Sequence, residues 1–204
     1  MEDQIRLNIG CGGRPLQGYI NIDMDTLDQI RVRYPNQTFD DDLVVKQFDI
    51  FNLPYAENSV DEVKAEGLIE HLSFIEEKKF FNEVTRVLKP GGVLCLVTVD
   101  FEKVARQWLD ADDDWQDFYR IDDEAILSQH WFGTYSYKSN NRWGYLTATL
   151  YGSQNGKGQF HTNCYSEAKL RAICKLLKLK VDSIDKFQWK GDRDHMLGLR
   201  AVKE

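Results

Sequence analysis

The chain has 204 residues, of which 42% are hydrophobic, 29% are charged and 12% are aromatic. This composition is typical of a globular protein and excludes disordered and collagen-like chains. Lys and Arg number 26 and Asp and Glu number 33, so the net charge is 26 − 33 = −7. Because an acidic surface repels phosphate backbones, we expect no nucleic-acid partner.

The sequence also argues against membranes and secretion. Its longest clean apolar run, Val93–Val97, is far shorter than the ~20 residues of a membrane helix. The opening residues are acidic and polar, not a basic and then apolar leader. The four cysteines contain no Cys-x-x-Cys pair, which favours free thiols in a reducing compartment. We therefore expect a cytoplasmic protein.

Strand and helix signals alternate over the first hundred residues. The strand signals lie at Ile5–Ile9, Tyr19–Asp23, Val44–Phe48, Val60–Ala65 and Val93–Val99. The last is a near-continuous apolar run, as expected for a parallel strand covered on both faces.

A capping box and a terminating turn delimit a helix before that last strand. Ser73 and Glu76 form the Ser-x-x-Glu box, and apolar residues then repeat at helical spacing up to Leu88. The turn at 89–92 contains Pro and two Gly and ends the helix.

The C-terminal part continues the alternation. Ser166 is the predicted N-cap of a second amphipathic helix, and strand signals follow at Val181–Phe187 and Met196–Val202. Strands that alternate with helices predict an α/β fold with a doubly wound, Rossmann-like, mostly parallel sheet. We find no linker or repeat, so we expect one domain over residues 1–204.

Residues 101–165 depart from this alternation and hold four of the five tryptophans. We interpret them as an aromatic-rich insertion after the fifth strand that forms the acceptor side of the site. His130, Trp131 and Tyr151 are the candidates for shaping or stacking on a substrate.

Chemistry-bearing residues follow three of the predicted strands in chain order. In a doubly wound sheet, ligands bind outside the carboxyl ends of the strands. A glycine turn, Gly10–Gly13, follows the first strand, Asp23 ends the second and Asp49 ends the third. Asp23 is placed to accept the hydroxyls of a ribose and Asp49 the amine of an adenine, with Met24 and Ile50 covering the ring.

The glycine turn is a poor fit for a dinucleotide. Pro15 stands where the Gly-x-Gly-x-x-Gly fingerprint needs its last glycine, which disfavours an NAD-binding oxidoreductase. Only nine residues, Gly10–Gly18, separate the first two strands, too few for a crossover helix whose N-terminus could bind a pyrophosphate. A phosphate-free adenosine ligand suits this turn better, and S-adenosyl-L-methionine is such a ligand.

Four segments resemble successive motifs of class I S-adenosylmethionine-dependent methyltransferases. They read LNIGCGG, YINIDMD, FDIFNLPYAENSVDEVKAEGLIEHL and VTRVLKPGGVLCLV, and lie within residues 5–100. The resemblance implies a seven-stranded sheet whose last strand is antiparallel. The short first crossover is similar to that of compact bacterial and phage members often associated with glycosyltransferases.

The same resemblance assigns roles to the site residues. Gly10, Cys11 and Gly12 would line the methionine portion of the cofactor. Asp23 would bind the ribose, and Asp49 with the Ile50 amide would bind adenine. Glu66 and Gly67 would flank the sulfonium. Asn8 is a further candidate for binding the cofactor. It stands where the family often has an acid, so the cofactor's amino group would be held differently.

A hydroxyl acceptor needs a general base, for which histidine is suited. His161 is our candidate base, and Asp100, directly after the fifth strand, could assist the acceptor. His71 matches a family histidine that is usually structural. No metal is expected, because the acidic run at 110–114 lacks the glycine and terminal acid of a calcium loop.

The sequence thus predicts an S-adenosylmethionine-dependent methyltransferase acting on a small-molecule or glycan-type acceptor. Two alternatives remain open. One is a non-catalytic module that binds the cofactor without transferring its methyl group, and the other is the NAD-binding oxidoreductase. The oligomeric state is not predicted.

Overall fold

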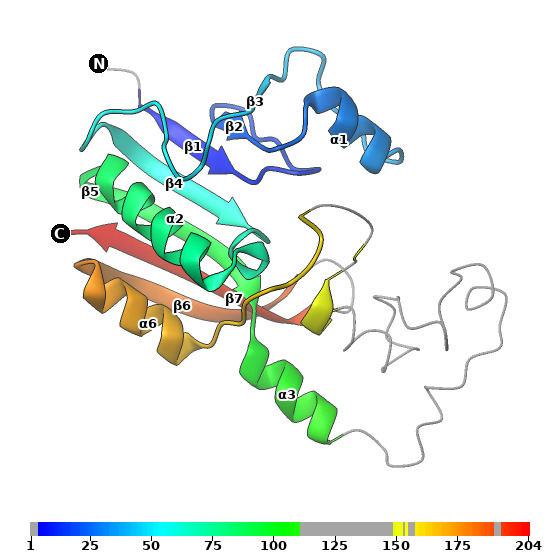
Figure 1. The fold of residues 1–204 in the computed structure, drawn as a ribbon, viewed down its shortest axis with the longest axis vertical. Helices are drawn as coiled ribbons and strands as arrows, with labels where there is room; N and C mark the ends of the chain where they lie inside the picture. Colours follow the sequence, from blue (N-terminus) through cyan, green and yellow to red (C-terminus); the bar gives the residue numbers. More distant parts are fainter. Residues whose placement is uncertain (1–3, 111–148, 153, 155–157, 190–192) are drawn as a thin grey trace, which may run out of the picture.

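The computed structural model describes residues 4–110, 149–152, 154, 158–189 and 193–204 (Figure 1). Their strands form one seven-stranded sheet in the order β3-β2-β1-β4-β5-β7-β6. The strands are β1 (Arg6–Ile9), β2 (Ile20–Ile22), β3 (Val45–Lys46), β4 (Val60–Glu66), β5 (Leu88–Val99), β6 (Leu179–Trp189) and β7 (Arg193–Lys203). Strands β1 to β5 pair in parallel, whereas β7 runs antiparallel to β5 and β6. The predicted mostly parallel α/β sheet with an antiparallel last strand is confirmed.

The helices are placed by their caps. They are α1 (Leu27–Arg33), the 3₁₀ helix η1 (Ile69–His71), α2 (Phe74–Val87), α3 (Phe101–Leu109) and α6 (Glu167–Leu176). The predicted capping box of α2 is present, because the Ser73 hydroxyl accepts from the Glu76 amide and the Glu76 carboxylate accepts from the Ser73 amide. Ser166 caps α6 as predicted.

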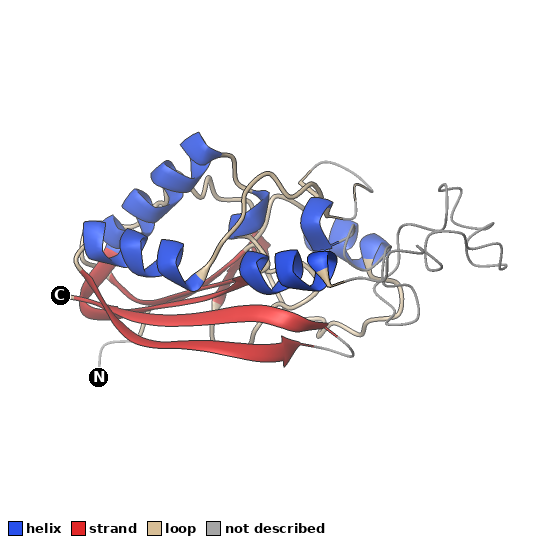
Figure 2. Ribbon diagram, turned by 90° about the horizontal axis from the view of Figure 1, so that it is seen from below, coloured by secondary structure: helices blue, strands red, loops and turns tan. Residues whose placement is uncertain are grey.

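The main core lies between the sheet and helices α2 and α6, which run along the same face of the sheet (Figure 2). Strand β5 shows how this packing differs from the prediction. Leu94 and Leu96 are buried against the helices, whereas Val93 and Val97 on the other face are half-buried. The strand therefore alternates, although its unbroken apolar run predicts burial on both faces.

A pair of buried asparagines holds the helix-free connection between β1 and β2. The Asn8 side-chain amide donates to Arg14 O and to Asn21 Oδ1, both over 2.9 Å. Asn21 in turn bonds both backbone groups of Leu16, at 2.8 and 3.1 Å. These bonds satisfy polar groups that a crossover helix would otherwise satisfy internally.

Two further features are the length of the helices and the state of the cysteines. No helix in the described part of the chain is both long and apolar enough to cross a membrane. All four cysteines are free, as predicted. Of the predicted insertion, the structure describes residues 101–110, 149–152, 154 and 158–165, while His130 and Trp131 lie outside the described residues.

Candidate functional site

The turn after β1 is bonded to the end of β2. The amides of Gly10 and Cys11 both donate to Ile22 O, at 2.8 and 3.1 Å. The Gly12 amide donates to Asp23 Oδ2 at 2.8 Å. Gly10 and Gly12 have φ values of +66° and +47°, a backbone conformation that residues other than glycine rarely adopt. The glycines are therefore needed for this turn to reach Asp23.

Asp23 is the buried centre of this edge, with a relative exposure of 7%. Its Oδ1 accepts from the Asp25 amide at 3.0 Å, and its own amide donates to O of Lys46, the last residue of β3, at 3.1 Å. Burial, and secondarily the negative charge of Asp23, raise the pKa of the Cys11 thiol to about 12. Cys11 is thus a neutral packing residue at neutral pH, not a nucleophile.

The predicted adenine side lies beyond β3. Asp49 is exposed, and its Oδ1 accepts from the Phe51 amide at 2.9 Å. Ile50 is half-buried and Met24 is 57% exposed. A Cβ added to Gly158 would lie 3.0 Å from Met24 Sδ, so the chain around Gly158 passes directly against Met24. A segment near the C-terminal half therefore borders the predicted adenine site.

The end of β4 closes the other side of the glycine turn. Glu66 pairs with Arg14 at 3.2 Å and with Lys64 at 2.9 Å, so its carboxylate faces the β1–β2 connection. Gly67 follows with φ +69°. A Cβ at Gly10 would lie 2.9 Å from Leu68 Cδ1, so the β4 end and the glycine turn are in close contact.

The comparisons with known proteins agree with this geometry. Residues 7–96 match a family described as a methyltransferase domain. This part of the chain is therefore similar to a methyltransferase domain. The matched residues span β1, β2, β3, β4 and most of β5, which contain the glycine turn, Asp23 and Asp49. No curated protein matches the chain.

Solved structures show the same fold. A SAM-dependent methyltransferase from Methanosarcina mazei is 16% identical with a TM-score of 0.58, covering 100% of this chain and 93% of that chain. The Burkholderia thailandensis 1,6-didemethyltoxoflavin-N1-methyltransferase, solved with S-adenosylhomocysteine, is 12% identical with a TM-score of 0.57, covering 98% and 70%. A putative methyltransferase from Listeria monocytogenes is 14% identical with a TM-score of 0.57, covering 99% and 92%.

S-adenosylmethionine is the cofactor of this methyltransferase domain, and the residues present fit it. Asp23 directly follows β2 and Asp49 lies three residues beyond the neighbouring β3, so their carboxylate oxygens could accept from ribose hydroxyls and an adenine amine. Gly10 and Gly12 have no side chains of their own, so a cofactor could approach their backbone closely. The side-chain amide of Asn8 bonds the β1–β2 connection. A contact between Asn8 and the cofactor stays a prediction.

A second polar group lies beyond Gly67, where η1 meets residues 160–163. The backbone oxygen of Glu70 accepts from the amides of Thr162 and Asn163, at 2.9 and 3.1 Å. His71 Nδ1 lies 3.0 Å from Phe160 O. The rings of His71 and His161 meet edge to face with centroids 4.6 Å apart. Two segments about ninety residues apart therefore join at one place.

The environment of His161 sets its protonation state. Its Nδ1 lies 2.7 Å from Thr149 O. Because a carbonyl only accepts, Nδ1 carries the proton and the Nε2 lone pair remains available. Burial lowers the pKa of His161, the Glu70 carboxylate opposes this, and the nearby His71 lowers it further. A neutral imidazole with an available Nε2 can accept a proton.

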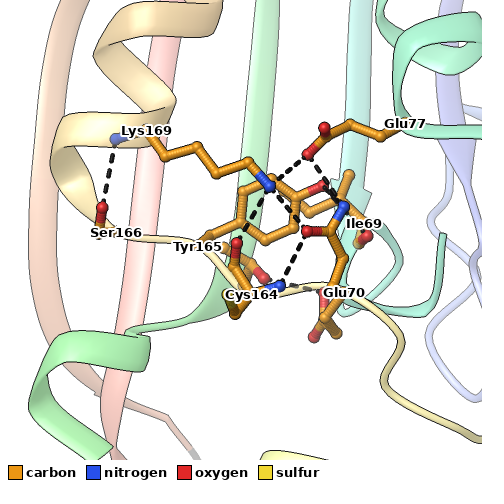
Figure 3. Close-up of polar contacts among 9 residues, drawn as sticks. Ile69, Glu70, Glu77, Cys164, Tyr165, Ser166 and Lys169 are labelled. Atoms are coloured by element: carbon orange, nitrogen blue, oxygen red, sulfur yellow. Dashed lines mark hydrogen bonds and ion pairs between the residues drawn. The ribbon is translucent and has the colours of Figure 1, made fainter. Parts of the chain in front are cut away.

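An ion-paired clamp fixes the segment that carries His161 (Figure 3). Lys169 of α6 contacts Glu77 of α2 at 2.7 Å and Asn163 Oδ1 at 2.7 Å, and its Nζ lies 4.2 Å from the centre of the Tyr165 ring. The Tyr165 hydroxyl donates to O of Ile69, the first residue of η1, at 3.3 Å. These contacts join α2, α6, η1 and residues 163–165 into one unit.

Two other predicted site residues, Asp100 and Tyr151, take part in contacts that hold the fold. Asp100 is 1% exposed, caps α3 by accepting from the Lys103 amide at 3.2 Å, and has Lys186 Nζ 3.4 Å from Oδ2. Tyr151 is 55% exposed, and its backbone oxygen accepts from the His161 amide at 3.1 Å.

The sequence did not predict a role for Glu70 or the contact between His71 and His161. The adjacent Glu70 and His71 were a visible signal, but nothing in the sequence placed them beside residue 161.

Proposed function

We propose that the chain is an active S-adenosylmethionine-dependent methyltransferase that modifies a hydroxyl group of a small-molecule or glycan-type acceptor. The observation that carries this proposal is the available Nε2 of a neutral His161, beside η1 and therefore close to the end of β4. A hydroxyl must lose a proton when it is methylated, and this nitrogen can take it.

When bound, S-adenosylmethionine would supply a methyl group on its sulfonium, and S-adenosylhomocysteine would be the leaving group when an acceptor oxygen attacks the methyl carbon in line. The protein's part is to align the two reactants and to remove the acceptor's proton. In this proposal the proton passes to His161 Nε2, and the Nδ1 contact with Thr149 O keeps the ring oriented and the tautomer fixed. Solvent later removes the proton.

The cofactor would lie along the edge formed by β1, β2, β3 and β4. Asp23 would accept the ribose hydroxyls, Asp49 and the Ile50 amide would bind adenine, and Met24 would cover its ring. Gly10, Cys11 and Gly12 would line the methionine portion, with Glu66 and Gly67 near the sulfonium. We assign Asn8 to holding the β1–β2 connection, because both of its amide bonds go there.

The acceptor side is proposed to extend over residues 101–165. Tyr151 is exposed beside the His161 segment, which supports an acceptor contact there. His130 and Trp131 keep their predicted role as acceptor contacts. Asp100 is assigned a positioning role instead of direct contact with the acceptor, because its carboxylate is buried at the α3 cap. We further propose one domain over residues 1–204 and a cytoplasmic location.

The rival reading is a module that binds the cofactor without transferring methyl groups. To separate the two, methyl transfer from labelled S-adenosylmethionine would be measured over a panel of sugars and small hydroxyl compounds. With the acceptor found, His161→Ala should lower turnover by at least about tenfold while S-adenosylhomocysteine binds unchanged. The control is Cys164→Ser, an exposed position three residues away. Methyl transfer that persists in His161→Ala rejects His161 as the general base. The absence of transfer to every acceptor tested supports the non-catalytic module.

A further inference from the structure

The polar group beside η1 has the composition of a metal site. Glu70, His71 and His161 each bring one potential ligand atom, and these atoms lie within 4.8 Å of one another. We propose that these three residues bind a divalent transition-metal ion such as Zn²⁺. The sequence predicted no metal, and in the chain His161 lies about ninety residues from the other two residues.

The histidines are oriented as metal ligands usually are. Nδ1 of His71 faces Phe160 O at 3.0 Å, and Nδ1 of His161 faces Thr149 O at 2.7 Å. Both contacts require a protonated Nδ1, so both rings keep a lone pair on Nε2. Metal-binding histidines commonly donate their second nitrogen to a backbone carbonyl in this way, which fixes the tautomer.

Glu70 completes the set with a carboxylate that is itself supported. The residue is 4% exposed, and its Oε2 accepts from the Thr98 hydroxyl at 3.0 Å. A carboxylate has about four lone-pair positions, so this bond leaves acceptor capacity for an ion. Two imidazoles beside a buried carboxylate give a set of acceptors, which a cation would satisfy.

The two halves of the proposed site are held together without an ion. The Thr162 hydroxyl donates to His71 O at 3.0 Å, and the Thr162 amide donates to Glu70 O at 2.9 Å. Binding an ion would therefore require little ordering of the backbone. Binding to a site that is already held in place costs less conformational entropy than binding to one that must first be assembled.

The ligand types select the metal. Imidazole suits Zn²⁺, Co²⁺, Ni²⁺ and Cu²⁺, whereas Mg²⁺ and Ca²⁺ prefer sites made of oxygen alone. Three protein ligands leave one position of a tetrahedral ion open to water or a substrate oxygen. The ion would take the Nε2 lone pair of His161, so metal binding and proton acceptance by His161 exclude each other. This last consequence, and only this one, rests on the proposed function.

The site is tested on the full chain after removal of metals with a chelator and dialysis. Titration with Co²⁺ should produce the visible absorption of a four-coordinate ion, and calorimetry with Zn²⁺ should give one site per chain. His71→Ala, His161→Ala and Glu70→Gln should each weaken Zn²⁺ binding by at least about tenfold. Cys164→Ser should leave it unchanged, which excludes the nearby exposed thiol as the ligand. Circular dichroism of each variant confirms that it is folded.

The outcomes separate this inference from the proposed function. Wild-type affinity in a folded His71→Ala/His161→Ala double variant overturns the metal site, whatever the activity. If the site is confirmed, Zn²⁺ at saturating concentration should inhibit methyl transfer. Activation by Zn²⁺ would instead reject His161 as the base and leave the metal site intact.

Discussion

The backbone amide of Gly12 donates to the carboxylate of Asp23 over 2.8 Å, although Gly12 follows β1 and Asp23 follows β2. This bond ties the glycine turn after β1 to the acid after β2. Asp23 therefore has two functions in our interpretation, because it holds the turn in the free protein and offers its carboxylate to a ribose. Its side chain is also bonded to the Asp25 amide at 3.0 Å, which fixes its direction.

Asp23→Ala is expected to weaken S-adenosylhomocysteine binding by at least tenfold, or about 1.4 kcal/mol, because both the ribose contact and the support of the glycine turn are lost. Isothermal titration calorimetry measures the change. Asp23→Asn keeps the shape but removes the charge, and should lie between wild type and Asp23→Ala. Equal affinity in all three proteins would remove Asp23 from the cofactor site. Titration with NAD in parallel tests the oxidoreductase alternative, which tighter binding of NAD would support.

Gly10→Ala should destabilise the fold for two separable reasons. Its φ of +66° is strained for alanine, and the new methyl group would lie 2.9 Å from Leu68 Cδ1. Gly91, with φ +80° and nothing within 4 Å of an added Cβ, isolates the first reason. We expect a loss of about 1 kcal/mol for Gly91→Ala and about 2–4 kcal/mol for Gly10→Ala, measured by urea denaturation. Equal losses would show that the contact with Leu68 gives way freely.

The contacts of Lys169 predict a variant that alters turnover more than cofactor affinity. Lys169→Met keeps much of the stem but loses the bonds to Glu77 and Asn163, so the segment leading to His161 loses its tie to α2. With an acceptor in hand, the maximal rate should fall several-fold while S-adenosylhomocysteine affinity stays near wild type. Lys175→Met, at an exposed position on the same helix, is the control. A parallel loss of cofactor affinity would contradict this assignment.

The sequence predicted those parts of the fold whose signals are local. The capping box at Ser73 and the N-cap at Ser166 each place a helix start, because they depend on residues three positions apart. Helix α1 has a capping box as well, formed by Thr26 and Gln29, but only seven residues, and we did not predict it. So short a helix carries too little apolar periodicity to be recognised in the sequence.

The candidate site likewise contains positions that the sequence predicts and contacts that it does not. The positions of Asp23 and Asp49 beyond β2 and β3 could be predicted, because parallel strands bring their carboxyl ends to one edge of the sheet. Their role in cofactor binding stays a prediction. The contact between His71 and His161 could not be predicted, since it depends on how residues 160–163 bond Glu70 O. Asn8 shows a third case. Its position in the motif was recognised, but its partners, Arg14 and Asn21, depend on the path of the β1–β2 connection.

Glu83 provides a prediction for stability at acid pH. The residue is 8% exposed and accepts from the Leu53 amide at 2.6 Å and from Arg86 at 2.6 and 2.8 Å. The hydrogen bonds from Arg86 are the main reason that the pKa of the Glu83 carboxyl is lowered, with burial opposing them. The unfolded chain therefore binds a proton at higher pH than the folded chain does. The stabilisation is complete above the unfolded pKa and is lost as pH falls through the lower folded pKa.

Glu83→Gln tests this coupling. At pH 7 it should lower the free energy of unfolding by about 1–3 kcal/mol, because a buried, charge-assisted set of hydrogen bonds is weakened. As pH falls below the usual pKa of a glutamate carboxyl, the difference in unfolding free energy between wild type and variant should narrow, since the wild-type carboxyl takes up a proton as pH passes its lowered pKa. Urea denaturation at a series of pH values measures the gap. Glu102→Gln, at an exposed position on α3, should show a small effect throughout. A gap that stays constant or widens toward low pH would mean that Glu83 stabilises the fold by its shape and not by its charge.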